Sequence, residues 1–252
     1  MAKKSVAMAH GYWAKLSATL TWACGPRIKL IKSNPCIGAS IIYDGSRVES
    51  IWSDDEIAKF CDEAPSHLVI ALMIALWTGQ REGSLVNLCW SAYDGDYLYV
   101  EQGKTRRHKK PKTVEVPVVG VFKAFMDRLE KQAGVVGLSK EERGQRYILL
   151  TDRGTPWADG PSFSSRFSTI NSEIVPERTF HDLRGTAVTR LARAGCTVPE
   201  IATITGHSLT TVQQILDKYY LKRDRVLATQ AMTKRNDYEL SQLPAQLLEN
   251  VI

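Results

Sequence analysis

The longest apolar run in the chain is the ten residues from Leu68 to Trp77. A helix with such a sequence is hydrophobic on every side, so other parts of the chain must surround it. Ser66 can cap this helix at its start, and Gly79 can end it. Spanning a bilayer takes about 20 residues, so we expect a buried helix and no membrane partner.

Apolar periodicity and turn signals predict that most of the remaining elements are helices. The capping box of Ser53 to Glu56 opens a short helix that Pro65 closes. Two β-rich segments, 97–101 and 113–118, predict a hairpin with a long charged tip, and 147–151 predicts a further strand. Further helices are predicted over residues 82–88, 122–133, 162–174, 181–194, 198–205, 209–219 and 221–232. The predicted fold class is mainly α with a small antiparallel β-sheet (α+β).

Basic residues are concentrated in two segments. The chain has 33 Lys and Arg against 27 Asp and Glu, a net charge of +6. Residues 102–112 carry six Lys or Arg and His108 but no acid, and the first 50 residues carry seven bases against two acids. Such segments are often only solvated, but they also suit a polyanionic partner such as nucleic acid.

The chain is expected to divide near residue 50, where Asn34-Pro35 and Asp44-Gly45 interrupt the sequence. Residues 1–50 form a basic N-terminal segment, and residues 51–252 form the main domain with a C-terminal helical tail. The five cysteines include no CxxC pair, which fits neither a disulfide framework nor a structural zinc site. The N-terminus has lysines but no apolar segment behind them, so we expect a cytoplasmic protein.

Several residues suited to phosphate chemistry recur along the chain. His181 and Arg184 lie one turn apart on a predicted helix. Their segment TFHDLRGTAVTRLARAG, with EIATITGHS and the less specific TGQREGSL and QGKT, resembles the tyrosine recombinases of the phage integrase group over roughly residues 65–230. The resemblance implies the catalytic-domain fold of that family.

The resemblance also implies an enzyme that cleaves and rejoins DNA strands through a covalent 3′-phosphotyrosine, a site-specific recombinase or integrase. Its catalytic residues correspond here to Arg81, Lys104, His181, Arg184, His207 and Tyr220. Guanidinium groups suit the nonbridging oxygens of the phosphate, and a hairpin lysine can protonate the leaving 5′-oxygen. By resemblance, His181 accepts a proton near the attacking Tyr220, and His207 hydrogen-bonds the phosphate. Arginines in the place of a Lewis acid predict no metal or other cofactor.

The implied partner is double-stranded DNA, bound by a homotetramer, and accessory DNA-bending proteins are a further possibility. Two departures from the family pattern stand out. The family usually has a carboxylate three residues after the first arginine to brace it, and this chain has Ser84 there. The segment 1–50 is also shorter than the family's DNA-clamping domain, so we interpret it as a remnant of that core-DNA-binding domain.

Some alternatives stay open at the level of sequence. Residues 198–215 also resemble a helix-turn-helix, which suits a non-catalytic DNA-binding protein, and a type IB topoisomerase shares the chemistry. Neighbouring basic residues can replace Lys104, and Tyr219 can replace Tyr220. The apolar spacing that includes Tyr219 favours Tyr220 as the nucleophile. We expect Arg184 to be exposed, so that its loss has little effect on folding.

Overall fold

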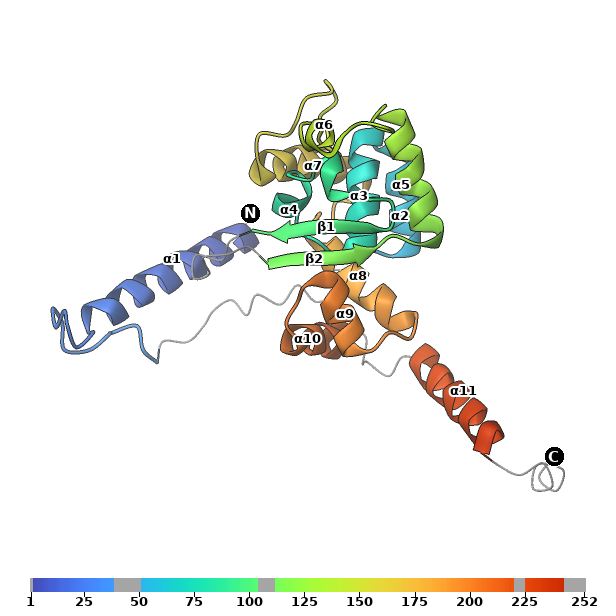
Figure 1. Cartoon of the computed structure of the whole chain (residues 1–252). Coiled ribbons are helices and arrows are strands. Elements are labelled where there is room, and N and C mark those ends of the chain that lie inside the picture. Colours follow the sequence, from blue (N-terminus) through green and yellow to red (C-terminus); the bar gives the residue numbers. More distant parts are fainter. Residues whose placement is uncertain (1, 39–50, 104–111, 220–224, 243–252) are drawn as a thin grey trace. The chain divides into compact units, whose positions relative to one another are not determined.

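The structure is a computed structural model of the 252-residue chain and describes residues 2–38, 51–103, 112–219 and 225–242 (Figure 1). The chain forms two compact units, Met1–Val48 and Glu49–Ile252.

The N-terminal unit contains a 22-residue helix, α1 (Ala2–Ala23), which the sequence analysis did not predict. Its six alanines favour a helix without any strong apolar periodicity. Asn34 is buried and ties the following segment to this helix. Its Nδ2 donates to the Ser17 carbonyl at 2.9 Å and to Thr21 Oγ1 at 2.8 Å, and its Oδ1 accepts from the Cys36 amide at 2.9 Å. A polar anchor therefore fixes the segment to the helix.

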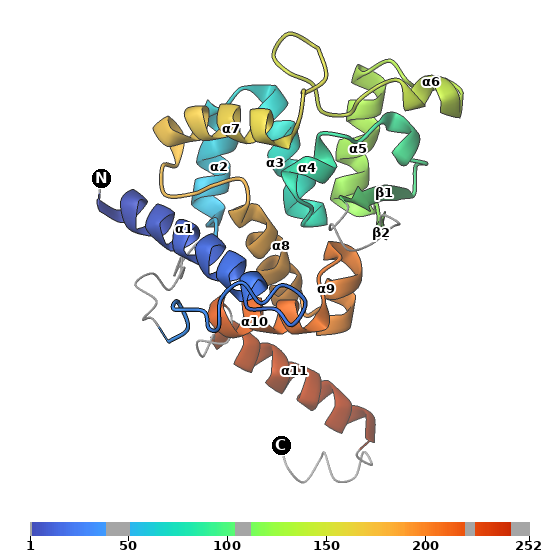
Figure 2. The same ribbon diagram turned by 90° about the vertical axis from the view of Figure 1, so that its left-hand side faces the viewer.

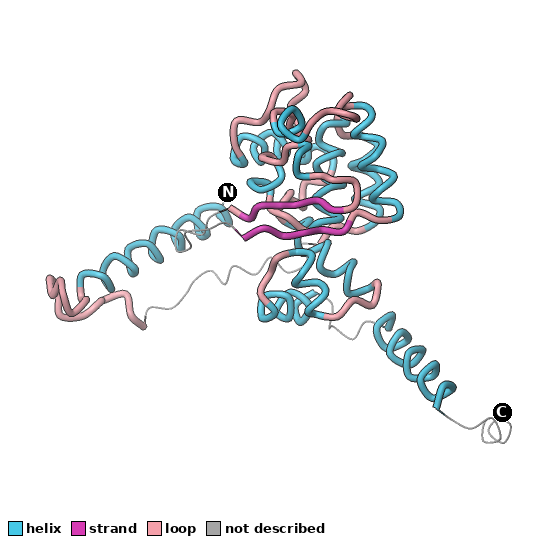
Figure 3. Tube along the Cα trace, viewed as in Figure 1, coloured by secondary structure: helices cyan, strands magenta, loops and turns pink. Residues whose placement is uncertain are grey.

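The C-terminal unit is mainly helical and carries a two-stranded antiparallel sheet, which confirms the predicted fold class (Figure 3). Its elements in chain order are α2 (Asp54–Glu63), α3 (Ser66–Thr78), α4 (Glu82–Leu85), the 3₁₀ helix η1 (Trp90–Ala92), β1 (Tyr97–Gln102), β2 (Lys112–Pro117), α5 (Gly120–Gln132), α6 (Lys140–Gly144), α7 (Gly160–Ile174), α8 (Asp182–Arg193), α9 (Val198–Thr205), α10 (Leu209–Tyr219) and α11 (Arg225–Gln242).

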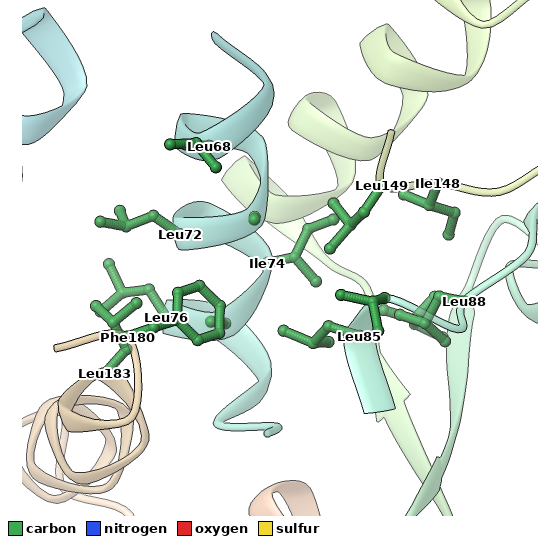
Figure 4. Packing of buried hydrophobic residues seen from close by; sticks show 14 of the residues in the cluster. Leu68, Leu72, Ile74, Leu76, Leu85, Leu88, Ile148, Leu149, Phe180 and Leu183 are labelled. Atoms are coloured by element: carbon green, nitrogen blue, oxygen red, sulfur yellow. The ribbon is translucent and has the colours of Figure 1, made fainter. Parts of the chain in front are cut away.

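Helix α3 lies at the centre of the larger core, as its apolar run predicts. Leu68, Leu72 and Ile74 are fully buried. Figure 4 shows Phe180 and Leu183 on one side of α3 and, on the other side, Leu85, Leu88, Ile148 and Leu149. None of the helices in the described ranges is long and apolar enough to cross a membrane.

Helix α8 connects this core to a second, smaller one. Its first turns pack against α3, and its later residues pack against α9 and α10 (Figure 2). The second core consists of Val188, Ala192, Ile201, Ala202, Val212 and Leu216. Residues at the start of α8 and in the turn between α9 and α10 are therefore held between two packed regions.

The sheet lies against α4 and α9. The strands pair from Tyr97 opposite Pro117 to Gln102 opposite Lys112, and the tip between them, 104–111, lies outside the described residues. Strand β1 contacts α4 and β2 contacts α9. The base of the basic hairpin is thus fixed next to α4 and α9.

Four local predictions need correction. The helix predicted over 82–88 is the shorter α4 and ends at Leu85. Pro65, not Ser66, is the N-cap of α3, because Ser66 already belongs to the helix. Residues 147–151 form no strand: Tyr147 bridges to Cys89, whereas Leu150 bridges to Pro156 after a tight turn, so no common partner strand exists. The last helix runs over Arg225–Gln242 where 221–232 was predicted.

Candidate active site

Four of the six residues predicted to be catalytic line one cavity of about 260 Å³. Arg81 directly precedes α4, His181 and Arg184 lie at the start of α8, and His207 lies in the turn between α9 and α10. The remaining lining residues are Asp182, Gly185, Thr211 and Ile215. Tertiary packing therefore brings together residues up to 126 positions apart in the sequence, from Arg81 to His207.

Lys104 and Tyr220 lie outside the described residues, so their roles stay predictions. Of the two elements that lead to them, α10 lines the cavity, and β1 is hydrogen-bonded through Gln102 to Thr205. Gln102, two residues before Lys104, ends β1, and α10, which lines the cavity through Thr211, ends one residue before Tyr220.

The turn before Arg81 has a defined geometry. Gly79 ends α3 in the left-handed conformation, with φ 64°, as predicted. A Cβ at this position would lie 2.8 Å from Thr205 Cγ2, so glycine is required by close approach as well as by conformation. Arg81 then adopts an extended backbone as the N-cap of α4. Among the described residues, neither Glu82 nor another carboxylate forms an ion pair with Arg81, so no other carboxylate takes the place of the one that Ser84 replaces.

Arg184 is buried, with an exposed fraction of only 4%, so the expectation of an exposed side chain is wrong. Its Nη1 donates to the carbonyl oxygens of Gly79 and, at 3.0 Å, Thr205. Its Nε is buried and has no hydrogen-bond partner in the described part of the chain. Leaving a buried donor unpaired costs roughly 1–3 kcal/mol, a cost that an anion in the cavity would offset.

In the described ranges, no carboxylate lies within ion-pair distance of Arg184 to compensate its charge. Burial, and secondarily the charge of Arg81, lower the pKa of Arg184 to about 9. The guanidinium therefore remains protonated at neutral pH, next to a second guanidinium. Such a site favours a ligand with negative charge spread over several oxygens.

His207 is neutral in this site. Burial and the nearby charges of Arg184, Arg81 and His181 lower the pKa of His207 to about 3. Its Nδ1 lies 2.8 Å from Thr205 Oγ1. The ring is therefore held at a fixed position on the cavity wall without adding a further positive charge.

The turn that leads into α8 is fixed by the first residue of the helix, Asp182. Asp182 is buried, and its Oδ2 accepts from the amide and the hydroxyl of Thr179, both at 2.7 Å. Trp52 Nε1 donates to the Thr179 carbonyl at 3.0 Å, which anchors this turn to the larger core. His181, the residue before α8, is exposed and reachable by a ligand.

Sequence reasoning missed a buried polar network behind the arginines. Gln102 Nε2 donates to Gln80 Oε1 at 2.9 Å and to the Thr205 carbonyl at 3.1 Å. Gln80 Nε2 in turn donates to the carbonyls of Thr78 and Ile204, both at 3.2 Å. The network joins the end of β1 to the turns before Arg81 and His207. One sequence signal could have pointed to this network: Gln80, Gln102 and Thr205 lie within the motif segments TGQREGSL, QGKT and EIATITGHS.

Gly206 gives a direct test of this network. It has φ 69°, and a Cβ there would lie 2.1 Å from Gln102 Nε2. Gly206→Ala should displace Gln102 and lower the free energy of unfolding by about 1–3 kcal/mol, as measured by urea denaturation. The matched control is Gly134→Ala, since Gly134 has φ 63° but open space around the Cβ position. Equal losses in both variants would contradict the importance of the Gln102 contact.

His207 should also make stability pH-dependent. The unfolded histidine binds a proton near pH 6.5, whereas the folded one binds it only near pH 3. Below the unfolded pKa the unfolded state is favoured by protonation, so stability should fall as the pH drops from about 6.5 toward 3. We expect His207→Gln to show a shallower decline in urea denaturation between about pH 7 and 4.5. Identical pH profiles in the wild type and in His207→Gln would show that protonation of His207 does not destabilise the folded protein.

The arrangement can bind a tetrahedral oxyanion through two guanidiniums and two imidazoles. Within the described ranges no group of three or more His, Cys, Asp or Glu side chains is placed to hold a metal ion. The guanidiniums and imidazoles themselves suit electrostatic stabilisation and proton transfer.

Comparison with known proteins first defines the fold. A lambda integrase dimer bound to a COC′ core site superposes with a TM-score of 0.65 at 22% identity, over 88% of this chain and 62% of that chain. XerA recombinase gives a TM-score of 0.55 at 20% identity, over 75% of this chain and 66% of that chain. The C-terminal unit therefore has the fold of a tyrosine-recombinase catalytic domain.

Sequence comparison then defines the family. The model of the phage integrase family matches residues 52–222, so the chain belongs to this family. Relatives include a XerC-like tyrosine recombinase of Caldanaerobacter subterraneus, 25% identical over 80% of this chain, and the integrase of Mycobacterium phage L5, 28% identical over 82% of this chain. The chain spans 60% and 57% of the length of these two proteins.

Proposed function

We propose that this chain is a site-specific DNA recombinase that cleaves and rejoins DNA strands through a covalent 3′-phosphotyrosine. The observation that carries the proposal is the cavity in which Arg81 and Arg184 converge, where a buried Arg184 Nε has no partner among the described residues. The oxygens of a phosphodiester group would accept hydrogen bonds from these guanidiniums, including the unpaired Nε of Arg184. Membership in the phage integrase family supports this choice of anion.

In the proposed reaction, Tyr220 Oη attacks the scissile phosphorus in line with the 5′-oxygen. The phenolic proton passes to His181, the bond to the 5′-oxygen breaks, and Lys104 protonates the leaving oxygen. Arg81 and Arg184 stabilise the negative charge that builds up on the nonbridging oxygens. Attack by a 5′-hydroxyl of another strand reverses these steps and rejoins the DNA, so no bond energy is lost to hydrolysis.

The proposed substrate is double-stranded DNA bound by a homotetramer. A solved lambda integrase tetramer bound to a Holliday junction shares this fold, with a TM-score of 0.64 at 23% identity. We also propose that residues 1–50 contribute to DNA binding as the remnant of a clamp domain, that the protein is cytoplasmic, and that accessory bending proteins assist assembly. The bases of α1 and the following segment, including Lys15, Arg27 and Lys32, are suited to phosphate contacts.

A suicide substrate tests the proposed function. Nicked duplexes prepared from the DNA of the source organism release a short strand after cleavage, so a covalent adduct accumulates and can be isolated under denaturing conditions. We expect an adduct, formed equally in EDTA because arginines occupy the place of a Lewis acid. A non-catalytic helix-turn-helix protein would bind without forming an adduct, and loss of cleavage in EDTA that magnesium restores would indicate a nuclease.

A type IB topoisomerase would also form the adduct. A plasmid with two copies of the DNA site that is cleaved in the adduct distinguishes recombination from relaxation. A recombinase exchanges the segments between the sites, whereas a topoisomerase only relaxes the supercoils.

Lys104 can be tested through the leaving group. Lys104→Ala should cleave normal DNA roughly 100-fold more slowly or worse, because it lacks the general acid. A 5′-bridging phosphorothiolate has a leaving thiolate that needs no proton, so the variant should cleave it at close to the wild-type rate. Single-turnover cleavage on gels measures both, with Lys109→Ala as the control from the same basic segment. Failure of the phosphorothiolate to restore the rate would assign the proton to another residue.

A further inference from the structure

Thr205 occupies an unusual position behind the cavity. It is fully buried, and three parts of the site depend on it. Its carbonyl oxygen accepts from Arg184 Nη1 and Gln102 Nε2, and its side-chain Oγ1 lies against His207. The hydroxyl is therefore placed to act on the histidine that lines the cavity.

The hydroxyl has two close neighbours but only one proton. Thr205 Oγ1 lies 2.7 Å from the Ile201 carbonyl oxygen and 2.8 Å from His207 Nδ1. A carbonyl oxygen can only accept, so the hydroxyl donates to Ile201. The contact with His207 is then a hydrogen bond only if Nδ1 carries a proton and donates to Oγ1. If the hydroxyl donated to Nδ1 instead, Thr205 Oγ1 and the Ile201 carbonyl oxygen would lie 2.7 Å apart with no proton between them.

This assignment fixes the chemistry of the other ring nitrogen. A neutral imidazole with a proton on Nδ1 has a lone pair on Nε2. No described residue hydrogen-bonds Nε2, and the ring lines the cavity. A phosphate oxygen also carries lone pairs, so it can bind Nε2 only when Nε2 gains a proton.

We infer that Thr205 is a positioning residue that holds His207 in the Nδ1–H tautomer, and that binding of a phosphodiester in the cavity is coupled to uptake of one proton from solvent by His207 Nε2. The inference rests on the proposed function for the identity of the anion. The tautomer itself rests only on the contacts of Thr205.

The groups around His207 explain why the proton arrives with the ligand. Arg184, Arg81 and His181 face the ring and oppose its protonation while the cavity is empty. Among the described residues, Asp182 is the one acid that lines the cavity, and its Oδ2 accepts from Thr179. A bound phosphodiester places a negative charge next to both guanidiniums and the His207 ring, which raises the pKa of His207 and favours its imidazolium form. The imidazolium then donates from both nitrogens, to Thr205 and to the phosphate.

NMR of the full chain labelled with ¹⁵N-histidine tests the tautomer without DNA. With only five histidines, His207→Gln identifies the signal. We expect the Nδ1–H tautomer in the wild type and in Thr205→Ser, which keeps the hydroxyl. Thr205→Val keeps the shape but not the acceptor, so the ring should change to the Nε2–H tautomer. An Nε2–H tautomer in the wild type, or no change in the valine variant, would overturn the inference.

Titration with dimethyl phosphate tests the proton uptake. This phosphodiester is already a monoanion and has no proton to give. Without ligand the pKa of His207 is about 3, and saturating ligand should raise it by at least about one unit, which corresponds to tenfold tighter binding to the protonated protein. The uptake is therefore measured in acidic buffer, between the free and the bound pKa of His207. Thr205→Val should lower the pKa of His207 by about one unit, because the imidazolium loses its acceptor.

The outcome separates this inference from the proposed function. If the suicide substrate forms an adduct but His207 does not gain a proton with dimethyl phosphate, the inferred coupling is wrong and the recombinase activity stands. If His207 gains the proton as expected but no adduct forms with DNA, the cavity binds a phosphodiester without the proposed cleavage.

Discussion

Replacing Tyr220 with phenylalanine is expected to abolish the covalent protein–DNA adduct while DNA binding persists. Cleavage without hydrolysis requires a nucleophile that conserves the phosphodiester bond energy, and phenylalanine lacks the oxygen that forms the new bond. The phosphate contacts that dominate DNA affinity belong to other residues. Adduct formation on the suicide substrate and a salt titration of binding measure the two properties separately.

The matched control is Tyr219→Phe. Val212 and Leu216 of α10 are buried in the smaller core. Tyr219 follows them in the sequence by seven and three residues, so the apolar spacing predicts that Tyr219, and not Tyr220, continues this stripe. We therefore expect Tyr219→Phe to keep forming the adduct with a modest loss of stability. The opposite pattern would assign the nucleophile to Tyr219.

Where local chemistry decides an element, the sequence predicted it well. Helix α9 begins with the capping box of Thr197 and Glu200 and ends at Gly206, and its observed bounds match those predicted. The capping box of Ser53 and Glu56 likewise opens α2. In each case one or two side chains satisfy the free backbone groups of the helix end, so a short pattern is sufficient.

Predictions that depended on tertiary partners were less successful. Residues 147–151 have strand-like composition, but a strand needs a continuous partner, and Tyr147 and Leu150 bridge to different segments. The burial of Arg184 was missed for the same reason. Its acceptors are carbonyls of Gly79, which is 105 residues away in the sequence, and of Thr205. No short pattern around Arg184 specifies those contacts.

Replacing Arg184 with lysine should lower the rate of strand cleavage by roughly 100- to 1,000-fold, because a donor aimed at a developing oxyanion contributes about 3–4 kcal/mol. Lysine keeps the positive charge and can still donate to the carbonyls of Gly79 and Thr205. It cannot also present a second donor in the position of the unpaired Nε. The loss should therefore appear in the single-turnover rate much more than in the free energy of unfolding.

Arg190→Lys and Arg184→Ala make this result specific. Arg190 lies on the same helix, about half exposed and paired with Asp54 away from the cavity, so its lysine variant should cleave at the wild-type rate. Arg184→Ala should lose cleavage and also stability, because it leaves a cavity and removes the donor to two carbonyls. It should also raise the pKa of His207, whose proton the Arg184 charge opposes. If Arg184→Lys cleaves at the wild-type rate, the guanidinium fork has no role in stabilising the transition state, and its burial serves the fold alone.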